Sequence, residues 1–164
     1  MTLANFRKAK WAPILGVIAA LSVSACTKKK VEDEVTAGAV DESALGDSDS
    51  GKAMGLQTIN FPYDSFVLST EAKSALKANA DILKDKASVK VQIEGHCDQR
   101  GGIQYNIALG EKRAAAVKKY LEDLGIAADR LATISFGKEK PLDAAETEAA
   151  YAKNRRANFA ITAR

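Results

Sequence analysis

Residues 95–117, GHCDQRGGIQYNIALGEKRAAAV, form the stretch around which the chain is organised. The preceding residues, 89–94, alternate apolar and polar side chains, which is typical of a β-strand with one buried face. A pair of glycines then interrupts regular structure. From about Gln104 apolar side chains recur every three or four positions, which predicts an amphipathic helix that ends at Gly125. Asp98 therefore directly follows a strand and shortly precedes a helix.

Three polar side chains of this stretch are expected to lie close together. Asn106 and Arg113 are seven positions apart, so they project from nearly the same side of the predicted helix, at the edge of its apolar stripe. Asp98, at the strand end, can face them from a separate element. An acid and a base on two sides of one small space suit a zwitterionic ligand. The alternative is a structural Asp98–Arg113 ion pair that pins the loop to the helix.

The spacing of these residues resembles a known motif. The pattern D-x2-G-x4-N-x2-L-x3-R is similar to that of the OmpA-like peptidoglycan-binding domains. Its positions are filled by Asp98, Gly101, Asn106, Leu109 and Arg113. The ordered blocks GHCDQRG, YNIALGEKRA, SFGKEKP and AAYAKNRRA resemble more closely the peptidoglycan-associated lipoproteins of the Gram-negative Tol-Pal system. This resemblance extends from about residue 58 to the C-terminus.

The resemblance implies a fold and a ligand. The fold is an α+β, two-layer sandwich with the element order β-α-β-α-β-α-β, in which the helices cover one face of a mixed sheet. The ligand is the meso-diaminopimelate of the peptidoglycan stem peptide. Asp98 is expected to accept hydrogen bonds from its ammonium group. Arg113 is expected to hold its carboxylate with the planar guanidinium fork, which Lys cannot reproduce.

The same resemblance assigns further positions and partners. Asp64 corresponds to an aspartate after the first strand, in a loop that forms part of the pocket wall, although an ordinary turn aspartate explains it nearly as well. Arg155, in the NRR triplet, is expected to border the cleft. TolB is the implied protein partner, with a role in envelope integrity and constriction at cell division. A wall-binding lipoprotein outside the Tol system is the alternative.

The N-terminal residues predict a lipid-anchored protein. Residues 1–25 have a basic start, an apolar run and then small residues, as in a secretory signal peptide. The run is shorter than the roughly 20 apolar residues of a membrane-spanning helix, which disfavours an inner-membrane anchor. The last four residues of the segment LSVSAC, residues 23–26, resemble a lipobox, so Cys26 is expected to carry the lipid. In lipoproteins of enteric bacteria, an Asp after the lipidated cysteine retains the protein in the inner membrane. Thr27 stands at this position, so the resemblance favours the periplasmic face of the outer membrane.

Composition divides the remainder into a tether and a folded head. Residues 26–56 are rich in Asp, Ser, Ala and Gly without periodicity, which predicts a disordered tether, and 57–164 form the domain. From Cys26 onward the chain has 21 basic and 21 acidic residues, which argues against binding to nucleic acid. Further elements of the head are expected as a strand at 58–61, a helix capped by Ser69, strands at 131–136 and 157–161, and a helix within 143–153.

The residues give little support to an enzyme. His96 and Cys97 precede Asp98, but this is the chain's single His, and a catalytic zinc usually needs three protein ligands. Adjacent strand residues also point to opposite faces of a sheet, so the pair is poorly placed to share one ion. We therefore expect no catalytic residue, metal or cofactor. A cell-wall hydrolase remains the less favoured reading, and Cys97 is expected to be a small, half-buried side chain.

Overall fold

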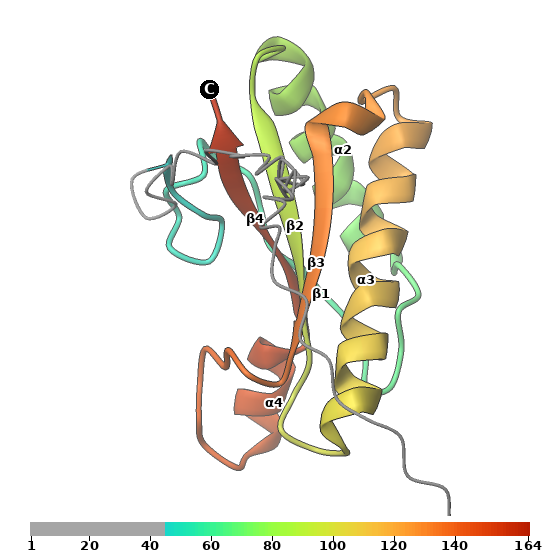
Figure 1. Cartoon of the computed structure of the whole chain (residues 1–164), viewed down its shortest axis with the longest axis vertical. Helices are drawn as coiled ribbons and strands as arrows, with labels where there is room; N and C mark the ends of the chain where they lie inside the picture. Colours follow the sequence, from blue (N-terminus) through green and yellow to red (C-terminus); the bar gives the residue numbers. More distant parts are fainter. Residues whose placement is uncertain (1–44) are drawn as a thin grey trace, which may run out of the picture. The chain divides into compact units, whose positions relative to one another are not determined.

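A computed structural model of the chain describes residues 45–164 (Figure 1). The predicted signal peptide, the lipidation site Cys26 and the tether up to residue 44 lie outside the described residues. No helix within residues 45–164 combines the length and the apolar character needed to cross a membrane.

A four-stranded mixed sheet forms one layer of the domain. In the order β1-β4-β2-β3, the strands are β1 (Ile59–Asn60), β4 (Arg156–Ala163), β2 (Lys90–His96) and β3 (Leu131–Gly137). Strand β4 is antiparallel to both β1 and β2, whereas β2 and β3 are parallel. Val91 lies beside Leu131 on one side and Ile161 on the other, so apolar residues align across the sheet. The predicted mixed sheet is confirmed.

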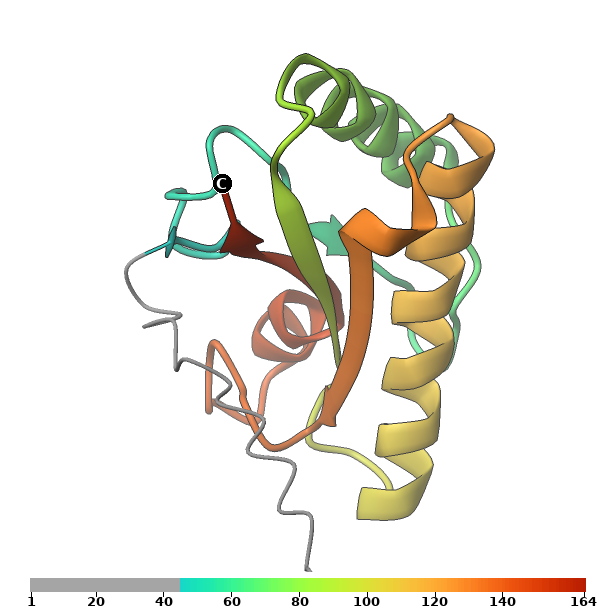
Figure 2. The same ribbon diagram turned by 45° about the horizontal axis from the view of Figure 1, so that its top comes forward.

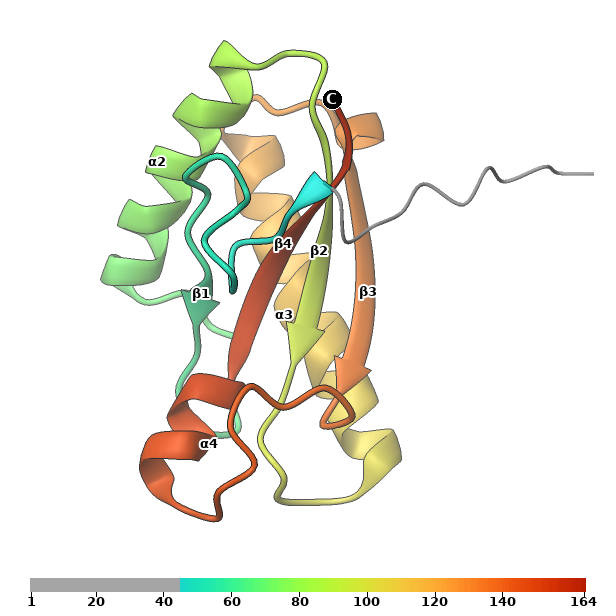
Figure 3. The ribbon, with the colours of Figure 1, turned by 90° about the vertical axis from the view of Figure 1, so that its left-hand side faces the viewer.

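Helices α2 (Thr70–Asp85) and α3 (Ile103–Asp123) cover one face of this sheet, and a short 3-10 turn, Ala128–Arg130, precedes β3 (Figures 1 and 2). The third helix, α4 (Glu148–Asn154), lies beside the end at which β2 and β3 finish (Figure 3). The α+β class predicted from the sequence is confirmed. The core between the layers contains buried Leu76, Leu83, Val91, Ile93, Val117, Leu121, Phe159 and Ile161.

Two glycines set the distance between α3 and the sheet. A methyl group added to Gly95 of β2 would overlap the backbone carbonyl of Gly110, and one added to Gly110 would overlap the Ser135 hydroxyl. The backbones of α3 and β2 are therefore in direct contact at this point. Gly110 lies one helical turn from both Asn106 and Arg113, so this contact holds the polar side of α3 beside the end of β2.

Residues 45–56 belong to the folded domain. The sequence predicted a tether over residues 26–56, and this prediction is wrong for residues 45–56. The Ser48 amide donates to the Phe159 carbonyl at 3.0 Å, and the Ile161 amide donates to the Gly46 carbonyl at 3.0 Å. Ala53 and Leu56 are buried in the core. The segment joins the sheet by single backbone contacts with β4 instead of a regular strand, so it has no side-chain periodicity to detect.

The capping predictions can be compared residue by residue. Ser69 caps α2 as expected, because its hydroxyl accepts from the Ala72 amide at 3.1 Å. Gly125 has a φ of +94°, in the left-handed region expected after a helix. The predicted helix within 143–153 begins later, at Glu148. The side chain of Asn154 accepts from the backbone amides of residues 142 and 143, which holds the preceding segment as a loop.

Candidate functional site

A cleft of about 50 Å³ opens at the end of β2, between the loop after β1, the loop before α3 and the start of β4. All seven residues predicted for the site line it: Asp64, Asp98, Gly101, Asn106, Leu109, Arg113 and Arg155. Four further residues line it as well: Tyr63, Cys97, Arg100 and Tyr105. The structure therefore brings together side chains from separate elements, as the sequence predicts.

Arg113 is a fully buried cation that is held by backbone carbonyls. Its Nε donates to the Ser65 carbonyl at 2.9 Å, Nη1 to the His96 carbonyl at 2.8 Å and Nη2 to the Pro62 carbonyl at 3.2 Å. Nη1 also lies 3.5 Å from the Cys97 sulfur. Burial lowers the pKa of Arg113. No acidic side chain within residues 45–164 forms an ion pair with it.

These bonds correct two expectations about Arg113. The direct Asp98–Arg113 ion pair, considered as the structural alternative, is not formed among the described residues. The two-pronged grip on a ligand carboxylate is also not available, because four of the five N–H groups of a guanidinium are already used. Only one hydrogen on Nη2 is left without an acceptor in residues 45–164. Arg113 therefore offers the cleft its charge and a single donor.

Asp98 is a buried carboxylate with two arginine partners. Its Oδ2 lies 2.6 Å from Arg100 Nη2 and 3.3 Å from Arg155 Nη1, and its Oδ1 accepts from the backbone amide of Arg100 at 3.1 Å. Burial alone would raise the pKa of the Asp98 carboxyl. The hydrogen bonds from Arg100 and Arg155 outweigh burial and hold this pKa below its usual value. Asp98 is therefore charged at neutral pH.

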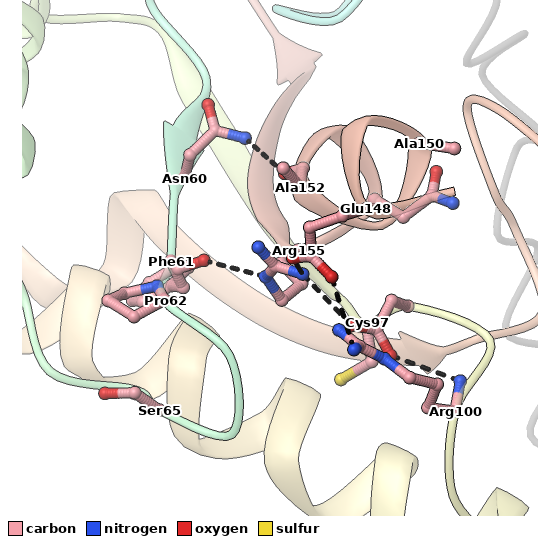
Figure 4. Close-up of polar contacts among 12 residues, drawn as sticks. Asn60, Phe61, Pro62, Ser65, Cys97, Arg100, Glu148, Ala150, Ala152 and Arg155 are labelled. Atoms are coloured by element: carbon pink, nitrogen blue, oxygen red, sulfur yellow. Dashed lines mark hydrogen bonds and ion pairs between the residues drawn. The ribbon is translucent and has the colours of Figure 1, made fainter. Parts of the chain in front are cut away.

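Arg100 is the functional-site residue that reasoning from the sequence missed. Its guanidinium lies between two aromatic rings, 4.2 Å from the centroid of Tyr63 and 4.4 Å from that of Tyr151. Besides Asp98, it pairs with Glu148 at 3.3 Å. Figure 4 shows Arg100 and Arg155 converging on the same region from different elements, with Glu148 between them. The sequence feature that could have indicated Arg100 is the segment Asp-x-Arg-Gly-Gly at 98–102. Its glycines favour a turn, and this turn brings Arg100 back to Asp98.

Asn106 and Gly101 shape the loop that carries Asp98. The Asn106 side chain donates to the Arg100 carbonyl at 2.7 Å, and the Cys97 thiol donates to the Asn106 carbonyl at 3.3 Å. Gly101 has a φ of +83°, which a residue with a side chain rarely adopts. The Asn106 amide, expected to face the ligand, thus serves at least in part to fix the loop.

The opposite wall of the cleft is the loop after β1. The Tyr105 hydroxyl donates to the Asp64 carboxylate, and this bond raises the pKa of Tyr105. Arg155 ties the same loop to β4, because its Nε donates to the Phe61 carbonyl at 3.2 Å. Its Nη1 binds Asp98 and Glu148, which leaves Nη2 without a partner among the described residues. Arg155 therefore keeps donors for a ligand.

The side chains of His96 and Cys97 lie on opposite faces of the sheet, as their adjacency in a strand predicts. Cys97 lines the cleft, and burial raises the pKa of its thiol. It is fully buried, not half-buried as expected. His96 lines a separate groove on the other face, with Glu94 and Lys140, and stacks on Phe136. Within residues 45–164 no cluster of His, Cys, Asp and Glu has three groups placed to hold a metal ion.

Comparison with known proteins identifies the domain that contains the cleft. The OmpA family matches residues 60–155, which include the β1 loop, Asp98, Arg113 and Arg155. The chain belongs to the OmpA family. The OmpA-family domain of this chain thus carries the whole cleft.

Several relatives are named peptidoglycan-associated lipoprotein. The one from Mesorhizobium japonicum is 33% identical over 150 residues, which cover 88% of this chain and 88% of the relative. The one from Haemophilus influenzae is 46% identical over 103 residues, 63% of this chain and 67% of the relative. The similarity extends beyond the domain itself in the first case.

Solved structures show the same fold. The crystal structure of the peptidoglycan-associated lipoprotein from Burkholderia pseudomallei aligns with a TM-score of 0.62 and 36% identity, over 63% of this chain and 88% of that chain. The C-terminal domain of Helicobacter pylori MotB aligns with a TM-score of 0.62 at 20% identity, over 66% of this chain and 85% of that chain. The second similarity concerns the fold alone.

Proposed function

We propose that this chain is a non-enzymatic lipoprotein whose OmpA-family domain binds peptidoglycan non-covalently, through the meso-diaminopimelate of the stem peptide. The observation that carries the proposal is the buried Arg113, a cation without an acidic partner among the described residues, in the same cleft as the charged Asp98. The relatives named peptidoglycan-associated lipoprotein support the choice of ligand.

The free end of diaminopimelate carries an ammonium and a carboxylate on one carbon, and the cleft offers a partner for each. Asp98 accepts hydrogen bonds from the ammonium. The carboxylate is bound by the remaining Nη2 donors of Arg113 and Arg155. Because hydrogen bonds to charged groups contribute about 1.5–3 kcal/mol each, a few of them give micromolar to millimolar affinity. Weak contacts suffice where many copies bind one continuous wall.

Co-sedimentation with purified peptidoglycan tests this proposal. The full-length protein in detergent is expected to pellet with the wall, and Asp98→Asn is expected to lower its affinity by about 10- to 100-fold, through loss of one charge-assisted contact. Asp143→Asn is the matched control, since Asp143 pairs with Lys153 at 3.0 Å outside the cleft. Equal sedimentation of the Asp98 variant and the control would contradict the assignment.

The remaining parts of the proposal concern the cellular setting. Cys26 carries the lipid anchor on the periplasmic face of the outer membrane, and residues 26–44 connect it to the domain. The domain then couples the membrane to the wall, with TolB as a partner in envelope integrity and division. Mass spectrometry of the N-terminal peptide tests lipidation at Cys26. A pull-down of TolB separates this role from a wall-binding lipoprotein outside the Tol system.

The absence of an enzymatic role is also open to a direct test. Zymography on a gel that contains purified peptidoglycan is expected to show no cleared band for the full-length protein. A cleared band would contradict the non-enzymatic proposal.

A further inference from the structure

Arg100 occupies the carboxylate that the proposed ligand needs. We infer that Arg100 acts as an internal competitor of the ligand: its guanidinium leaves Asp98 when the ammonium group of diaminopimelate arrives. This inference rests on the proposed function. The motif leaves position 100 unspecified, so the motif itself assigns no role to Arg100.

The Asp98 carboxylate is covered while Arg100 is in place. The side chain of Asp98 is 5% exposed, and its Oδ2 already accepts from Arg100 Nη2 at 2.6 Å. An ammonium group cannot come within hydrogen-bond distance of that oxygen from the Arg100 side without displacing the guanidinium. One of the groups around Asp98 must therefore move before the ligand can bind.

Arg100 is the more exposed of the two arginine partners of Asp98. The side chain of Arg155 is 9% exposed and also bonded to the Phe61 carbonyl, so it is fixed inside the domain. The side chain of Arg100 is 35% exposed, although it also lines the cleft. Its Nε is buried but has no hydrogen-bond partner within the described residues, so fewer of its donors are held in place.

A second acidic side chain remains as a partner for the released guanidinium. Glu148 lies 3.3 Å from Arg100 Nη1, and its side chain is 66% exposed, so it can follow the guanidinium outward. The rings of Tyr63 and Tyr151 flank Arg100 on both sides and favour a cation between them. Arg100 therefore keeps one of its two acidic partners when it leaves Asp98.

The competition has a defined thermodynamic consequence. A ligand that binds only when Asp98 is free has an apparent affinity reduced by the fraction of molecules in that state. Partly exposed ion pairs shift such an equilibrium modestly, so removal of the Arg100 competitor is expected to tighten binding by about two- to fivefold. A residue that itself binds the ligand has the opposite effect, because its loss weakens binding.

Arg100→Met provides the test. Methionine keeps an apolar chain between the two tyrosine rings and removes the side-chain donor of residue 100, while the backbone amide of this residue can still donate to Asp98 Oδ1. The binding of a synthetic tripeptide, L-Ala-γ-D-Glu-meso-diaminopimelate, to full-length protein in detergent is measured by isothermal titration calorimetry. Lys119→Met is the matched control, since Lys119 pairs with Asp123 on the exposed surface of α3. Arg100→Gln replaces the methionine variant if circular dichroism shows that the latter does not fold.

The outcomes separate this inference from the proposed function. Tighter binding by the Arg100 variant, with an unchanged control, supports the competitor role. Binding that is unchanged or weaker in the Arg100 variant overturns it and leaves the proposed function intact. A wild-type protein that does not bind the tripeptide, and does not sediment with peptidoglycan, overturns the proposed function itself.

Discussion

Replacement of Arg113 by Met is expected to destabilise the domain as well as to abolish wall binding. Methionine fills much of the same buried space, so the main loss is hydrogen bonding. The carbonyls of Pro62, Ser65 and His96 each lose a donor from Arg113. At about 1 kcal/mol net for each of the three hydrogen bonds lost, the free energy of unfolding falls by roughly 3 kcal/mol. For a domain of this size, that lowers Tm by roughly 10–15 °C.

Urea unfolding followed by far-ultraviolet circular dichroism measures this change. Lys112→Met is the matched control, because it makes the same substitution at the neighbouring, exposed position of α3. The control is expected to stay within about 0.5 kcal/mol of the wild type. An Arg113 variant with the same unfolding midpoint as the Lys112 variant would refute the reasoning, since the carbonyl contacts would then contribute nothing measurable to stability.

Three further results are expected. Gly110→Ala places a methyl group against Ser135 and is expected to cost about 1–3 kcal/mol or more in urea unfolding; wild-type stability would show that α3 can move away from β2. Hydrogen bonds from Arg100 and Arg155 outweigh burial and lower the pKa of Asp98, so this carboxylate is charged at pH 5. Its stabilising effect is fully present above the unfolded-state pKa and is lost as pH falls through the folded-state pKa. We therefore expect wall sedimentation to persist at pH 5 and to be lost only below the ordinary aspartate pKa of about 3.9. Cys97, with its raised pKa, is expected to resist iodoacetamide at pH 7 until urea unfolds the chain, as checked by mass spectrometry of its peptide; rapid labelling of the folded protein would contradict its burial.

The sequence predicts most of the architecture because long periodic segments carry it. The alternation at 89–94 and the apolar stripe of α3 require burial of one face, so β2 and α3 follow from side-chain pattern alone. The segment 45–56 lacks such a pattern. It joins β4 through single backbone bonds, which place no periodic demand on side chains. Its inclusion in the domain could therefore not be inferred.

The site shows the same limit at the level of single side chains. Motif spacing correctly placed Asp98 and Arg113 around one cleft. It did not show that Arg113 is bonded to carbonyls of the loop after β1, because contacts between residues about fifty positions apart depend on tertiary packing. Arg100 was missed for another reason. Its approach to Asp98 depends on a turn, and turns have no repeating pattern in the sequence.

A crystal structure of the protein bound to the diaminopimelate tripeptide is the most direct test of the central claim. We expect the ammonium nitrogen of diaminopimelate at about 2.7–3.2 Å from an Asp98 carboxylate oxygen, with the Arg100 guanidinium displaced toward Glu148. A tripeptide bound elsewhere on the domain, with Arg100 still paired to Asp98, would contradict both the ligand assignment and the role given to this cleft.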